Sequence, residues 1–179
     1  MPVPFEDLRE GEPTGAVGFL RFVDEADGKG IRGALFLTSG RGEPVDFCFT
    51  RIDVHRSFLW RRGDARRQAV TALIKVLFQA ANRIPVLILA LANEIPPQLF
   101  VDDIHVRVPL CLVAPSETPV QADTAVSQSA REVNLTWVTE RPGDESEAIR
   151  LLDGFMRRRD PLEPFERAAT GLEEAFSDR

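Results

Sequence analysis

PVLILALA, residues 85–92, is a continuous apolar run without a polar residue to place on a solvent-facing side. Strands that are covered on both faces have this composition, and they lie in the interior of parallel or mixed sheets. The run follows residues 64–82, whose apolar side chains repeat at the three-and-four spacing of an amphipathic helix. A helix that leads into a buried strand is the usual crossover of such a sheet. We therefore expect a central strand over 85–92.

Further strands are expected on both sides of this unit. Residues 15–23, 31–38 and 44–52 are strand-like and are separated by the turn-rich sequences DEADGKG and SGRGEP. The alternation slips in the third, which predicts a bulge or the end of the strand near Thr50 and Arg51. Residues 103–113 alternate cleanly, and 134–139 predict one more strand. The expected fold is α/β or α+β: a mixed five- to six-stranded sheet with a crossover helix and a C-terminal helical pair.

This order of elements resembles the topology of the ribonuclease-H-like fold. The resemblance implies that the fourth strand pairs with the first, so that the third and fifth strands lie far apart. Enzymes of that fold carry an aspartate in the middle of the first strand, where this chain has Phe19, Leu20 and Arg21. They also carry a glutamate along the crossover helix, where no acid follows Asp64. Glu94, after the fourth strand, stands where an acid is expected.

The chain divides into three expected segments. Residues 1–113 predict an α/β core domain, and residues 114–133 are polar and aperiodic, as in a linker or long loop. Residues 134–179 predict a strand and two helices that pack on the core or on a partner. Asp144 and Glu147 suit the start of one helix, and Asp160 and Pro161 suit the start of the other.

Composition places the protein among ordinary cytoplasmic proteins. The formal net charge is −6, which argues against coating nucleic acid by bulk attraction. Cys48 and Cys111 lie in apolar runs, with no CxxC pattern, as expected in a reducing compartment. No apolar run approaches the roughly 20 residues that cross a bilayer, and the N-terminus lacks the pattern of a signal peptide. We expect a cytoplasmic protein that does not bind a membrane.

Two Asp-x-His units raise the question of whether they bind one metal ion together. They are Asp53 with His55 and Asp103 with His105, which include both histidines of the chain. Under the expected topology their strands are separated by four strand spacings, or roughly 19 Å. Zinc takes its ligands at about 2.0–2.3 Å, so one ion does not join the two units.

A second constellation follows from the expected sheet. Parallel strands end at one edge, where open α/β sheets place their ligands. That edge would collect Asp24, Asp53 and Glu94 as candidate catalytic acids, and the same three with His55 as candidate metal ligands. Converging carboxylates hold Mg²⁺ or Mn²⁺, and such ions support phosphodiester hydrolysis. The alternative is that these acids are ordinary turn and loop carboxylates without a catalytic role.

Arginines gather just before and within the start of the predicted helix. Phe58 and Trp60 lie among them, and arginines interleaved with aromatic rings are typical of single-strand nucleic-acid binding. The alternative is a solvated helix start, whose charge is compensated by a Glu or Asp of a partner or of the acidic C-terminal tail. The candidate anion-binding residues are Arg51, Arg56, Arg61, Arg62, Arg66 and Arg67.

The C-terminal segment carries a narrow apolar seam. Leu162, Phe165, Leu172 and Phe176 recur with a 3-4-3-4 spacing that also includes Ala169. A helix of this length does not stand alone, so the seam packs on the protein's own sheet or docks on another chain.

Two functions from different classes remain. The leading expectation is a small non-catalytic subunit or adaptor without a cofactor, which docks on a larger protein that handles nucleic acid. The alternative is a divalent-metal-dependent nuclease with a ribonuclease-H-like fold.

Overall fold

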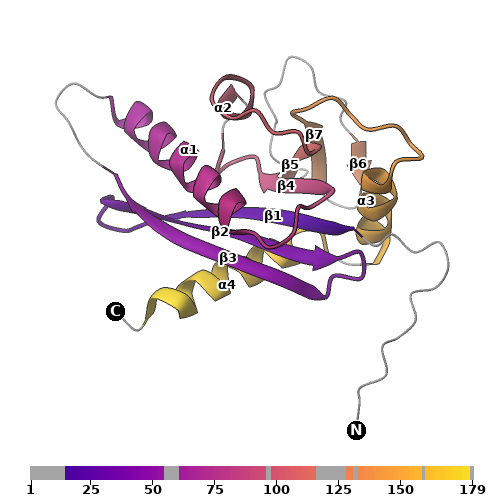
Figure 1. The fold of residues 1–179 in the computed structure, drawn as a ribbon, viewed down its shortest axis with the longest axis horizontal. Coiled ribbons are helices and arrows are strands. Elements are labelled where there is room, and N and C mark those ends of the chain that lie inside the picture. Colours follow the sequence, from indigo (N-terminus) through magenta and orange to yellow (C-terminus); the bar gives the residue numbers. More distant parts are fainter. Residues whose placement is uncertain are drawn as a thin grey trace, which may run out of the picture.

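The computed structural model describes residues 15–54, 61–95, 98–115, 128–130, 133–158 and 160–177. In these ranges seven strands form a mixed sheet with helices on both faces (Figure 1). The strands are β1 (Ala16–Asp24), β2 (Gly30–Ser39), β3 (Pro44–Asp53), β4 (Leu87–Leu91), β5 (Leu110–Pro115), β6 (Gln128–Ala130) and β7 (Val133–Trp137). The helices are α1 (Arg62–Ala80), α2 (Gln98–Asp102), α3 (Glu147–Arg158) and α4 (Glu163–Ser177). None of these helices is long and apolar enough to cross a membrane.

The sheet order is β3-β2-β1-β4-β5-β7-β6, which confirms the predicted topology. β1 pairs antiparallel with β2 and parallel with β4, and β2 pairs antiparallel with β3. β1, β3 and β4 therefore run in one direction, and their carboxyl ends meet at one edge. Four strand spacings separate β3 from β5, and Asp53 and Asp103 pair with different arginines, Arg51 and Arg67.

Within the described ranges the sheet has seven strands, more than the five or six expected, and its fifth strand begins further along the sequence than predicted. β7 pairs with β5, and β6, a three-residue strand inside the expected linker, extends the sheet beyond β7. The strand predicted from residue 103 begins at Leu110 instead. The Ile104 N–H bonds to the Leu99 carbonyl, so this residue continues the turn of α2. Ile104 is buried there, which explains the apolar alternation without a strand.

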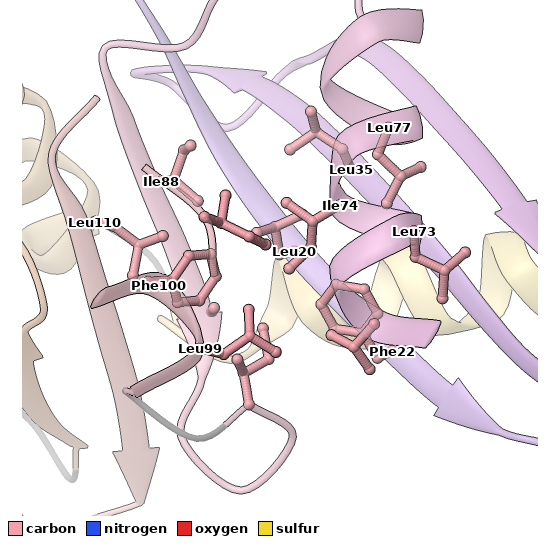
Figure 2. Packing of buried hydrophobic residues seen from close by; sticks show 14 of the residues in the cluster. Leu20, Phe22, Leu35, Leu73, Ile74, Leu77, Ile88, Leu99, Phe100 and Leu110 are labelled. Atoms are coloured by element: carbon pink, nitrogen blue, oxygen red, sulfur yellow. The ribbon is translucent and has the colours of Figure 1, made fainter. Parts of the chain in front are cut away.

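Two apolar layers hold the sheet. On one face, Leu73, Ile74 and Leu77 of α1 meet Leu20 and Phe22 of β1 (Figure 2). On the other face, α3 and α4 form a second buried cluster with β1, β2, β4, β5 and β7. Because both faces are covered, the central strands carry apolar residues on both sides, as the run 85–92 predicted.

Of the two alternatives for the third strand, β3 ends at Asp53, close to the predicted place, and its bulge lies at the other end. The register with β2 shifts where Leu37 pairs with Asp46 and Thr38 with Pro44, which leaves Val45 as the extra residue. Near Thr50 and Arg51 the pairing is regular. The apparent slip there arises because β3 has apolar neighbours on both faces.

The apolar seam of α4 packs within this chain. Phe165 and Leu172 are buried, and Leu162 is half-buried against the same cluster. The Phe165 ring meets Phe19 of β1 edge-on, with 5.3 Å between centroids. Two of the four residues considered for docking on a partner are therefore covered by the protein's own sheet.

Candidate functional site

The carboxyl ends of β1, β3 and β4 carry the three candidate acids, but these acids do not converge. Each is held by a different arginine: Glu94 by Arg21, Asp24 by Arg66 and Asp53 by Arg51. Among the described residues, no three His, Cys, Asp or Glu side chains lie together as a metal site would require.

Glu94 is the acid most deeply set at this edge, with 8% of its surface exposed. Its Oε2 accepts a hydrogen bond of 2.8 Å from the backbone N–H of Phe22. Its Oε1 forms an ion pair with the Arg21 guanidinium. Both carboxylate oxygens are thus engaged by β1, which leaves Glu94 poorly placed to bind a cation.

Arg21 stands at the position of β1 that adjoins Glu94. Burial lowers the pKa of Arg21, since removal from water disfavours the charged form. Its Nε is buried and has no hydrogen-bond partner within the described ranges. A fixed positive charge beside Glu94 repels a divalent cation, so these residues do not fit Mg²⁺ or Mn²⁺.

α1 is tied to the edge by two further arginines. Arg66 Nε lies 3.1 Å from both carboxylate oxygens of Asp24, and its Nη1 donates to the Glu94 carbonyl at 3.0 Å. Arg67 forms ion pairs with Asp102 and Asp103 next to α2. For Arg66 and Arg67, the compensating anions are therefore acids of this chain, Asp24, Asp102 and Asp103, and not acids of the C-terminal tail.

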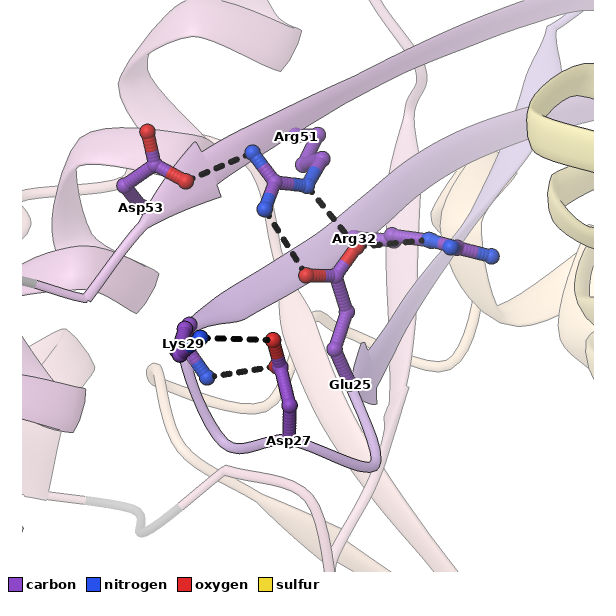
Figure 3. Close-up of polar contacts among 6 residues, drawn as sticks. All are labelled: Glu25, Asp27, Lys29, Arg32, Arg51 and Asp53. Carbon is purple, nitrogen blue, oxygen red and sulfur yellow. Dashed lines mark hydrogen bonds and ion pairs between the residues drawn. The ribbon is translucent and has the colours of Figure 1, made fainter. Parts of the chain in front are cut away.

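A charge network links the first turn to β2 and β3 (Figure 3). Glu25 Oε1 accepts from Arg51 Nε at 2.8 Å and from Arg32 Nε at 3.1 Å, and Oε2 accepts from Arg51 Nη2 at 2.8 Å. Arg51 Nη1 reaches Asp53 at 2.6 Å. The hydrogen bonds from Arg51, and then those from Arg32, lower the pKa of Glu25 against the opposing effect of burial.

Glu25→Gln should reduce stability by about 1 kcal/mol near neutral pH, the upper end for a partly exposed ion pair. The lowered pKa means that the stabilisation is fully present above the ordinary value of 4.5. It is lost as pH falls through the lower pKa of the folded state. Thermal unfolding across this range, with Glu43→Gln as an exposed control, should show the difference shrinking in acid. A difference that stays constant with pH would contradict the ion-pair role.

The remaining candidates are exposed or lie outside the described residues. Arg61 and His105 are exposed. His55 and Arg56 lie outside the described residues, as do Phe58 and Trp60, and the side chain of Arg62 is likewise not described.

Sequence reasoning did not give a role to Arg21. The available signal was a charged residue inside the otherwise apolar strand sequence GAVGFLRFV. A buried charge in a strand requires a partner, but the partner lies 73 positions away in the sequence, so the strand itself does not reveal it.

The cysteines do not add nucleophilic chemistry. Burial raises the pKa of Cys111 to about 12. The pKa of Cys48 is raised by burial and by the nearby Asp46 carboxylate, to which its Sγ points at 3.7 Å. Both thiols therefore stay protonated near neutral pH.

Comparison with known proteins gives a likeness of fold. No family model matches the chain, and no curated protein matches its sequence. Endonuclease V of Streptomyces avermitilis is similar in structure, with a TM-score of 0.63 at 14% identity over 93% of this chain and 83% of that one. Endonuclease V of Bacillus subtilis gives 0.62 at 10% identity, covering 93% and 84%.

Endonuclease V of Ciona intestinalis, solved in complex with a DNA that contains inosine, gives 0.57 at 9% identity over 92% and 87%. At these identities the likeness is one of fold. The chain therefore has the ribonuclease-H-like fold of endonuclease V catalytic domains, with arginine–carboxylate pairs along its carboxyl edge.

Proposed function

We propose that this protein binds nucleic acid at the carboxyl edge of its sheet and does not cleave it through a divalent metal. The observation that carries the proposal is the ion pair of Arg21 with Glu94, within a fold shared with nucleases. Arg21 supplies a fixed positive charge beside the one acid that stands where enzymes of this fold carry one. Because the pair has no net charge, Glu94 neither repels a phosphate backbone at this edge nor offers a free carboxylate to a metal ion.

The DNA-bound neighbour supports this choice of ligand. It was solved in complex with DNA, and the likeness of fold extends over 92% of this chain. Arg61 lies exposed at the N-cap of α1, where the helix dipole also favours an anion. Further along α1, Asp24 orients Arg66, and Asp102 with Asp103 orients Arg67.

Oligonucleotide binding tests the proposal. Arg61→Ser should weaken binding and reduce the slope of log affinity against log salt by about 0.7–0.9, the value for one lost phosphate contact. Arg83→Ser is the matched control, because Arg83 is exposed after the other end of α1. Fluorescence anisotropy over roughly 50–200 mM salt measures both quantities. Equal slopes for wild type and Arg61→Ser would exclude Arg61 as a phosphate contact.

A second candidate function is metal-dependent cleavage, which the fold of the neighbours and the position of Glu94 favour. It requires Arg21 to release Glu94 when a metal and a strand bind. Incubation of purified protein with Mg²⁺ or Mn²⁺ and labelled DNA or RNA separates the two functions. Cleavage that Glu94→Ala abolishes would establish the nuclease. The expected docking on a larger protein stays a prediction.

A further inference from the structure

A pocket of about 590 Å³ opens on the α4 side of the carboxyl edge. Its lining residues are Glu25, Arg32, Phe49, Thr50, Arg51 and Phe176. Arg32 and Arg51 are direct partners in the pairing of β2 with β3, so their side chains leave the same face of the sheet. The volume lies within the ~300–1,000 Å³ of small-ligand sites.

Aromatic rings form one wall of this pocket. Phe49 is 47% exposed, whereas Phe47, the other ring of its strand, is half-buried and lies 5.7 Å from it between centroids. It meets Phe176 of α4 edge-on at 5.7 Å between centroids, and the Arg32 guanidinium lies 5.1 Å from the centroid of Phe176. Exposing a large ring costs hydrophobic free energy, so the exposed surface of Phe49 suits a ligand that covers it.

The charged groups of the pocket neutralise one another. Arg51 uses Nε and Nη2 to bind Glu25 and Nη1 to bind Asp53, and Arg32 uses Nε to bind Glu25. Two arginines thus face two carboxylates, and the local field is not that of a phosphate site. The same bonds hold both guanidinium planes in place, and a fixed guanidinium offers a flat surface on which an aromatic ring stacks.

We propose that this pocket receives one unpaired nucleobase of a bound strand, stacked on Phe49. A base is planar and uncharged, which matches a site built from rings and guanidinium planes with balanced charge. The inference rests on the proposed nucleic-acid binding and adds its substrate form: a single strand, or a strand with a base turned out of the duplex. Base pairing in an intact duplex would withhold the base from Phe49.

Two single strands of about 12 nucleotides test this, a length within the range of known single-strand sites. One carries thymine throughout, and the other has the same backbone with abasic positions in its centre. Wild type should bind the thymine strand more tightly. Phe49→Ala should weaken that binding by about 5- to 150-fold, the equivalent of the ~1–3 kcal/mol lost with one stacking ring. Binding of the abasic strand should not change.

Phe49→Leu serves as a second variant, because it keeps an apolar side chain but removes the ring. It should lose most of the preference for thymine if stacking is responsible. The salt slope should match wild type in both variants, since no phosphate contact is removed. Val76→Ala, exposed on α1, is the control for loss of exposed apolar surface.

The outcomes separate this inference from the function on which it rests. If the thymine strand binds wild type and Phe49→Ala equally, the base pocket is wrong while nucleic-acid binding stands. The base pocket is also wrong if Phe49→Leu binds both strands as wild type does. If no strand binds wild type, both proposals fail.

Discussion

Phe165→Ala should lower the free energy of unfolding by about 3–5 kcal/mol, the usual cost of removing a buried phenylalanine ring. The ring is 2% exposed and packs edge-on against Phe19, which joins α4 to the middle of the sheet. Phe155 of α3 contacts the same Phe19 ring, also at 5.3 Å between centroids. The cavity would therefore open where both C-terminal helices meet β1.

Denaturant unfolding measures this effect, with Ile84→Ala as the control. Ile84 is 85% exposed, so its truncation should change stability by less than about 0.5 kcal/mol. If Phe165→Ala kept the stability of the wild type and lost a captured partner instead, the seam of α4 would serve another chain, as the sequence also allowed.

Glu94→Ala should cost about 3 kcal/mol, the lower end of the ~3–5 kcal/mol for breaking a buried ion pair. The lower end applies because the Arg21 side chain is 24% exposed and water can still reach it. The variant would leave the Arg21 charge without its partner and the Phe22 N–H without its acceptor. Glu94→Gln should be milder, since an amide oxygen still accepts from Phe22.

A double variant isolates the charge pair from the rest of the site. Arg21→Met with Glu94→Gln removes both charges and should recover much of the stability that Glu94→Ala loses, because an uncharged replacement of a buried pair is often neutral. The coupling energy is the free-energy change of the double variant minus the sum of the changes in Arg21→Met alone and Glu94→Gln alone. Coupling near zero would show that Arg21 and Glu94 do not stabilise each other.

The pattern of hydrophobic residues in the sequence predicted most of the fold. Residues 85–92 and the helical stripe of α1 indicated a covered sheet with a crossover, and the structure confirms both. Two strand predictions differ from the structure: the strand expected from residue 103 begins later, and β6 was not expected. Ile104 is apolar because it is buried in the core after α2, and not because it lies in a strand. β6 has three residues, which are too few to show an alternation of apolar and polar side chains.

The candidate site could likewise be predicted only in part from the sequence. Strand direction predicted that Asp24, Asp53 and Glu94 share an edge, since topology alone decides that. Which arginine meets each acid depends on contacts between distant segments, such as Arg66 with Asp24, 42 positions apart. The pocket beside Phe49 is harder still to predict from the sequence, because Phe49 belongs to β3 and Phe176 to the last helix, α4.

Binding of an oligonucleotide with and without divalent metal tests the central claim most directly. The protein should bind a labelled strand with the same affinity in EDTA as in Mg²⁺ or Mn²⁺, and the strand should remain intact, because Arg21 rather than a metal accompanies Glu94. Affinity that requires the metal, or cleavage in Mn²⁺ that disappears in Glu94→Ala, would contradict this account.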